Sequence, residues 1–132
     1  MNKTIFGTGI FFGLTAILLG AFGAHGLEKM IDAKAIGTFE TGVTYQMYHA
    51  LFLMILGGCN ILGSEGKKIV YYFIVAGVVC FSFSIYLLAT NDLSGFDFKK
   101  LALLTPFGGV LLVTGWILLG IKVLKWKPSN QN

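Results

Sequence analysis

Two histidines are the side chains of this sequence best suited to proton transfer or metal binding, and both lie within long apolar runs. His25 closes the segment Gly20-Ala-Phe-Gly-Ala-His, and His49 closes the segment Phe39-Glu-Thr-Gly-Val-Thr-Tyr-Gln-Met-Tyr-His. Ionisable groups in apolar segments are costly and often functional. Two histidines make only half of a zinc site, and no HExxH or cysteine-rich set accompanies them. We therefore expect no metal or cofactor; structural histidines and a ligand or proton role both stay open.

Four further polar residues near the histidines are candidate ligand-binding residues. They are Glu40, Tyr45, Gln46 and Thr105. An even number of membrane spans would bring these motifs to the face opposite the termini. We expect an outer-leaflet polar cluster there, built around His25, Gln46 and His49. Glu40 would lie about 180° from His49 on a helix, so we expect it to cap the positive start of the second helix instead.

The residues between 42 and 60 carry a stripe that should face the interior of a bundle. At 100° per residue its members lie within about 60° of one another. They are Gly42, Gln46, His49, Leu53 and Asn60.

The composition is that of a membrane protein. The chain is 55% hydrophobic and 12% charged, with a mean hydropathy of +0.78, outside the usual range of soluble domains. Its charges leave four uncharged runs, 4–27, 41–64, 69–91 and 101–121. Each can cross a hydrocarbon core of about 30 Å at about 1.5 Å per residue. We predict one all-α domain over 1–132, a four-helix transmembrane bundle with spans at about 4–24, 42–62, 69–90 and 105–124.

The connections between these spans carry their own predictions. The apolar residues of 27–39 recur at three and four residues among charges, which predicts an interfacial amphipathic helix between the first two spans. Thr105-Pro106 is typical of an N-cap followed by proline at the first helical position, with 98–104 as a short interfacial piece. A continuous helix kinked at Pro106 is the alternative.

The basic residues indicate topology. All ten are lysines, so the bidentate arginine contacts of nucleic-acid readers are missing and we expect no nucleic-acid partner. Six lysines against one acid fall on the side of the termini, and four against five acids on the other. The positive-inside rule then places both termini in the cytoplasm of an inner-membrane protein. Gly9 and Gly13 form a GxxxG pair that fits packing within the bundle or a homo-oligomer face.

Several motifs together resemble the small membrane proteins of domain-of-unknown-function family 423. They are residues 20–27, 39–51 and 81–89, Thr105-Pro-Phe-Gly-Gly and Gly115-Trp116. The resemblance covers nearly the whole chain and implies a four-span bundle in the bacterial inner membrane. It implies no activity, and its motif residues His25, Glu40, Tyr45, Gln46, His49 and Pro106 remain site candidates.

We expect a non-enzymatic protein that binds or passes a small ligand, lipid or ion, or that scaffolds a membrane partner. No catalytic motif is present: the sequence has no GxSxG, no P-loop and no carboxylate pair within a span. The rival hypothesis is a membrane enzyme on a lipid or quinone-like substrate. In it His49 is the general base and Gln46 or Tyr45 orients it.

Overall fold

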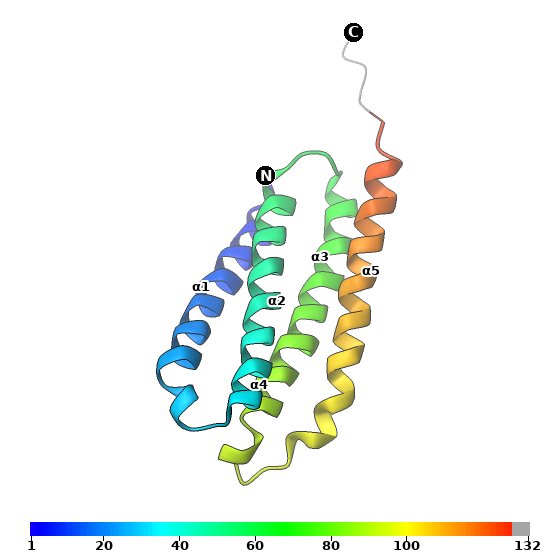
Figure 1. Ribbon diagram of the computed structural model, residues 1–132. Helices are drawn as coiled ribbons and strands as arrows, with labels where there is room; N and C mark the ends of the chain where they lie inside the picture. Colours follow the sequence, from blue (N-terminus) through cyan, green and yellow to red (C-terminus); the bar gives the residue numbers. More distant parts are fainter. Residues whose placement is uncertain (128–132) are drawn as a thin grey trace.

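The structure is a computed structural model that describes residues 1–127, and every regular element in that range is helical. Four long helical segments run side by side, each antiparallel to the next along the chain (Figure 1). The long helices are α1 (Lys3–His25), α2 (Ala33–Gly58), α3 (Ser64–Val78) continued by α4 (Ser84–Ala89), and α5 (Leu104–Leu124). The predicted all-α four-helix bundle is confirmed.

The two ends of the bundle differ in what they carry. The N-terminus, the loop between α2 and α3 and the last turn of α5 lie at one end, which we call the termini end (Figure 1). The connections from α1 to α2 and from α4 to α5 lie at the other, which we call the connector end (Figure 1). The connector end holds three short 3-10 helices, Leu27–Lys29, Asn91–Leu93 and Phe98–Leu103.

The helix α2 begins nine residues earlier than the predicted span. Asp32 caps it by accepting a hydrogen bond from the backbone N–H of Ala35 at 2.7 Å. The expected interfacial helix is therefore not a separate element: its residues form a 3-10 turn and the first turns of α2. The expectation that Glu40 caps this helix is wrong, because Glu40 lies well inside α2, beyond the first turn where a carboxylate can meet unpaired N–H groups.

Small residues let α1 and α2 pack closely. A Cβ on Gly9 would come within 2.7 Å of the carbonyl oxygen of Ala50, and one on Gly57 within 2.6 Å of the backbone nitrogen of Phe6. Such contacts allow dispersion forces to act between backbones in a lipid environment. Gly9 is thus buried against α2, while Gly13 is only half-buried.

The helices α3 and α4 are joined by a π-helical turn over Val79–Phe83, and together they form one long helix of 26 residues, Ser64–Ala89. Glycines of α5 pack against this helix: a Cβ on Gly108 would lie 2.4 Å from the backbone nitrogen of Phe81. Two serines follow within and after the π turn. Because Ser82 and Ser84 are two residues apart, they face roughly opposite sides of the helix, toward α2 and α5 respectively.

The start of α5 also departs from the prediction. The short piece before the span exists as the 3-10 helix Phe98–Leu103, but it runs directly into α5, and the residue before α5 makes no side-chain cap. Thr105 is thus not an N-cap; its hydroxyl lies 2.6 Å from that of Ser84. Pro106 still fits, because the backbone N–H groups of a first helical turn have no partner within the helix.

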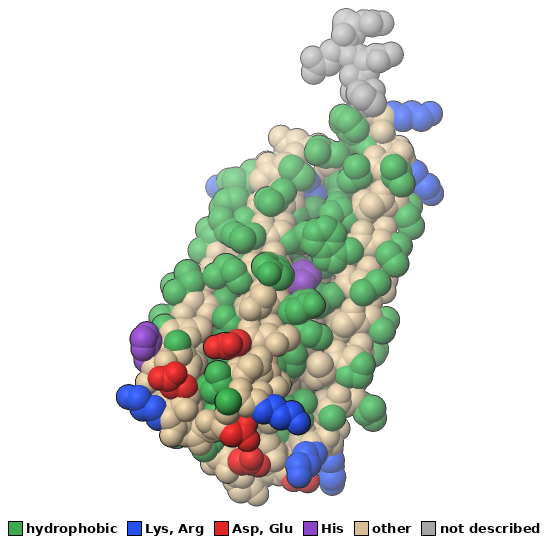
Figure 2. Space-filling view, in the orientation of Figure 1, with side chains coloured by type: hydrophobic (Ala, Val, Ile, Leu, Met, Phe, Trp, Pro, Cys, Tyr) green, Lys and Arg blue, Asp and Glu red, His purple; other side chains and the backbone are tan. Residues whose placement is uncertain are grey.

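Apolar side chains cover the middle of the bundle, and the charges gather at its two ends (Figure 2). Among the residues that the structure describes, three helices can cross a membrane by length and composition: Lys3–Lys29, Ser64–Ala89 and Phe98–Leu124. The remaining helix, α2, is 26 residues long but carries four polar side chains at its middle, those of Tyr45, Gln46, Tyr48 and His49. Gln46 and His49 of this segment are buried against other helices, whereas Tyr45 and Tyr48 are exposed.

The packing order leaves α2 and α5 apart. Close contacts join α1 to α2, α2 to α3 and α4, and α3 to α5. Within the described residues, α2 and α5 do not pack closely along their lengths, and neither do α1 and α5. The bundle is therefore an open row of helices with a groove on the α2–α5 side.

Candidate functional site

Gln46 is the centre of a buried hydrogen-bond network that joins three helices. Its amide nitrogen donates to the carbonyl oxygen of Phe12 at 2.9 Å and to the hydroxyl of Thr15 at 2.8 Å. Its amide oxygen accepts from the hydroxyl of Tyr86 at 2.7 Å. Both amide hydrogens and the carbonyl are thus used, so the side chain is held in one orientation. This network ties α1 and α4 to α2.

The same face of α2 receives a serine from the π turn. Ser82 is fully buried and donates to the carbonyl oxygen of Gly42 at 2.8 Å. Gly42 lets the ring of Tyr86 pack against α2 beside this serine, because a Cβ on Gly42 would lie 2.7 Å from that ring. The predicted stripe is confirmed for its first four members, which are buried in α2. It is wrong for Asn60, which lies beyond the end of the helix and is exposed.

His49 is buried on the side of α2 that faces α5, and both its ring nitrogens have partners. Its Nδ1 lies 2.7 Å from the carbonyl oxygen of Tyr45, and its Nε2 accepts the indole N–H of Trp116 at 3.2 Å. A carbonyl can only accept, and an indole N–H can only donate. The geometry therefore selects the neutral imidazole with its proton on Nδ1. The aromatic rings of Tyr45, Phe52 and Trp116 surround it.

The structure separates the candidates that the sequence grouped together. Gln46 and His49 lie at the middle of α2, because that helix begins at Ala33 and not near residue 42. His25 is exposed at the end of α1, ten residues or about 15 Å from the level of Thr15. Gln46 and His49 thus lie halfway along the bundle, and His25 lies at its connector end, away from them.

Two other candidates, Glu40 and Thr105, also lie apart from the network. Glu40 is exposed on α2. Thr105 contacts Ser84 near the connector end. Tyr45 is 41% exposed and packs on the ring of Phe81, with ring centroids 4.9 Å apart. Of the predicted residues, only Tyr45, Gln46 and His49 are brought near one another.

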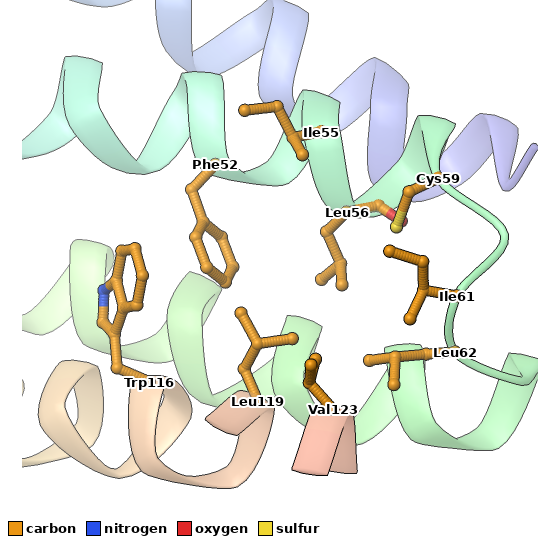
Figure 3. A pocket seen from close by; sticks show the side chains of 9 residues that line it. All are labelled: Phe52, Ile55, Leu56, Cys59, Ile61, Leu62, Trp116, Leu119 and Val123. Carbon is orange, nitrogen blue, oxygen red and sulfur yellow. The ribbon is translucent and has the colours of Figure 1, made fainter. Parts of the chain in front are cut away.

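The groove between α2 and α5 contains two cavities in series. The mid-depth cavity has a volume of about 440 Å³ and is lined by Tyr45, His49, Phe81 and Trp116, among others. The terminal cavity, of about 290 Å³, reaches to the termini end between Phe52, Cys59 and Val123 (Figure 3). Trp116 lines both cavities and packs on Phe52 with ring centroids 4.7 Å apart, so this aromatic pair divides the groove.

A second groove lies on the other side of the bundle, between α1 and the α3–α4 helix. Its volume is about 480 Å³, and its walls are apolar apart from Thr15, Gln46 and Tyr86. Those three polar groups bond to one another or to the backbone, so they offer little to a ligand. Among residues 1–127, no three His, Cys, Asp or Glu side chains come together as a possible metal site.

Comparison with known proteins gives the family. A family model described as "Protein of unknown function (DUF423)" matches residues 19–109. The chain belongs to the DUF423 family. It is similar to a UPF0382 membrane protein of Staphylococcus saprophyticus, 38% identical over 112 residues that cover 85% of this chain and 89% of the relative. It is also 37% identical to the UPF0382 membrane protein YwdK of Bacillus subtilis over 115 residues, 86% of this chain and 89% of the relative. No solved structure matches it.

This DUF423 protein is therefore a membrane protein, and two of its site residues escaped the sequence analysis. In the sequence, Trp116 and Tyr86 stand out only as members of the family motifs Gly115-Trp116 and 81–89. A signal existed for Tyr86, since it follows Ser82 and Ser84 in a polar segment of an otherwise apolar run. For Trp116 the sequence offered no sign that its N–H would meet His49, 67 residues away.

Proposed function

We propose that this protein is a non-enzymatic, lipid-binding membrane protein of the inner (plasma) membrane, which holds an apolar chain in the groove between α2 and α5. One observation carries the proposal: the backbones of α2 and α5 do not approach closely, and the space between these helices is two consecutive cavities with almost wholly apolar walls. In a bilayer, such a groove opens to acyl chains. A chain lying in it would bury apolar surface on Phe52, Trp116 and Val123.

The groove has the features expected of a binding site more than those of a surface irregularity. Most of its walls come from α2 and α5, and the rest from the π turn and the α2–α3 loop. The Phe52–Trp116 pair and His49 stiffen it at the middle. Aromatic rings on rigid helices present a large contact area with little loss of side-chain entropy, which favours binding. His49 and Trp116 supply the few polar atoms that a largely apolar pocket uses for orientation.

The enzyme hypothesis has less support. A general base needs a free nitrogen within hydrogen-bond reach of the proton that it removes. In His49, Nδ1 bonds to a backbone carbonyl and Nε2 to Trp116. A substrate would have to displace the indole first. Gln46, proposed to orient that base, spends its hydrogen bonds on Phe12, Thr15 and Tyr86.

Both termini in the cytoplasm remain part of the proposal. The termini end of the bundle is the lysine-rich end, with six lysines and the single acid Glu65. Glu65 itself pairs with Lys68 at 2.7 Å. The positive-inside rule then orients this end toward the cytoplasm. Labelling of single cysteines at the two ends in intact cells tests the orientation.

Photo-crosslinking tests chain binding directly. The full chain is placed in lipid nanodiscs that contain a phospholipid with a diazirine in the middle of one acyl chain, and labelled peptides are mapped by mass spectrometry. We expect labels to concentrate on the groove walls of α2 and α5. Val113→Trp fills the mid-depth cavity and Val123→Trp the terminal one, so each should lower the labelling severalfold.

A matched control is available on the same helix. Val110 is 62% exposed and lines none of the described cavities, so Val110→Trp adds the same bulk outside the groove. Its labelling should equal that of the unaltered protein. Labels spread evenly over all exposed helix faces, with no effect of the two groove variants, would overturn the proposal.

A further inference from the structure

Lys67 is a buried cation beside the terminal cavity of the groove. Its side chain is on the first turn of α3, and the residue is only 5% exposed. Its ammonium donates to the carbonyl oxygen of Cys59, at the C-terminal end of α2. Within residues 1–127 the only ion pair is Lys68 with Glu65, so no carboxylate accompanies Lys67.

A single carbonyl does not satisfy this group. An ammonium has three N–H donors, and burying a charge is costly unless it is paired. The negative end of α2 supplies only a partial charge. One anionic oxygen or more at this position would complete the hydrogen bonds of Lys67 and compensate its charge.

A second lysine lies at the same place. The side chain of Lys122, from the end of α5, crosses Gly66, and its Nζ is 3.8 Å from the position of a Cβ on that glycine. Gly66 precedes Lys67, so a lysine of α5 and a lysine of α3 lie at neighbouring positions of the first turn of α3. Cys59, the partner of Lys67, also lines the terminal cavity. The basic pair and the apolar groove are thus adjacent.

We propose that the ligand of the groove is an anionic phospholipid, whose phosphate binds Lys67 and Lys122 while one acyl chain enters the terminal cavity. This inference rests on the proposed function. The dimensions agree: Val123 and Trp116 are seven residues apart on α5, or about 10 Å. Half of a hydrocarbon core is about 15 Å, so a chain from this leaflet reaches the level of Trp116 and His49.

The combination of charge and groove favours a lipid over a soluble anion. A free phosphate would satisfy the lysines but would leave the adjoining apolar walls unused. A zwitterionic lipid would bring its own cation next to two ammonium groups. Only an anionic headgroup with an attached chain uses both features of the site.

Lipid competition tests this inference. The full chain is purified in mild detergent and offered equal amounts of phosphatidylglycerol and phosphatidylcholine with identical acyl chains, and the bound lipids are counted by native mass spectrometry. We expect a clear preference for phosphatidylglycerol. Lys67→Gln and Lys122→Gln should each weaken that preference by about fivefold, while Lys67→Arg should keep it.

Controls separate the inference from the proposed function. Lys99→Gln, at the connector end, should leave the preference unchanged. Because Lys67→Gln removes a buried contact and could impair folding, the Lys122→Gln result stands on its own. If both lipids bind equally while crosslinking still maps to the groove, the inference fails and chain binding stands. If no lipid is retained and no groove label forms, both fail. Displacement of phosphatidylglycerol by inorganic phosphate alone would also overturn the inference.

Discussion

Trp116 donates its indole N–H to Nε2 of His49 at 3.2 Å, and this hydrogen bond joins α5 to α2 across the groove. The other ring nitrogen, Nδ1, is 2.7 Å from the carbonyl oxygen of Tyr45. Only the neutral imidazole with its proton on Nδ1 can make both bonds. A protonated ring would direct an N–H at the indole N–H and lose the contact. The groove is thus held at its middle by an uncharged, directional contact.

The tautomer of His49 is the first prediction. Nitrogen-15 NMR of the full chain in nanodiscs at neutral pH should show a protonated Nδ1 and a bare Nε2. Trp116→Phe removes the donor but keeps a ring, so it should lower the free energy of unfolding by about 1 kcal/mol and let the second tautomer appear. Trp126→Phe, outside the groove, is the control. A proton found on Nε2 in the unaltered protein would contradict the assignment.

The network around Gln46 leads to a second prediction. Gln46→Leu leaves the hydroxyl of Tyr86 buried without its acceptor, which should cost about 1 to 3 kcal/mol of unfolding free energy. Tyr86→Phe removes that orphaned hydroxyl. The double variant should therefore be less destabilised than the sum of the single ones, as a double-mutant cycle in detergent measures. Strict additivity would mean that the two side chains do not interact.

Much of the fold could be predicted from the sequence, because lipid imposes a simple rule of length and polarity. The spans 4–24 and 105–124 agree closely with α1 and α5. The start of α2 could not be placed by that rule, since its first turns are charged and amphipathic while still helical. A local signal was present in Asp32, a favoured N-cap residue just before Ala33.

The site was only partly predictable. Helical periodicity correctly put Gln46 and His49 on the inner face of α2. Their partners lie 40 and 67 residues away in the sequence, in Tyr86 and Trp116. Which residues meet across helices depends on the relative heights of the helices and on the π turn at Val79–Phe83, and no local pattern encodes these.

The two acids of the α1–α2 connection and early α2 give a third prediction. Asp32 accepts the N–H of Ala35, whereas Glu40 is exposed and makes no hydrogen bond in the described structure. Asp32→Ala should lower the free energy of unfolding by about 1 kcal/mol, the usual loss for an N-cap. Glu40→Ala is the matched control and should change it by a few tenths at most. Thermal unfolding in detergent measures both, and equal losses would argue against the observed start of α2.

The contact between α1 and α2 gives the last prediction. In Gly9→Ala the new Cβ would lie 2.7 Å from the carbonyl oxygen of Ala50 and 2.9 Å from the backbone nitrogen of Met54. These are backbone atoms that cannot rotate away, so the helices must separate, at a cost of about 1 to 3 kcal/mol. Gly7→Ala, two residues earlier, meets nothing within 4 Å and should be neutral or slightly stabilising through helix propensity. Because both variants add one methyl to the same helix, a difference in unfolding free energy isolates the α1–α2 contact. Equal stability of the two would show that Gly9 does not lie against α2.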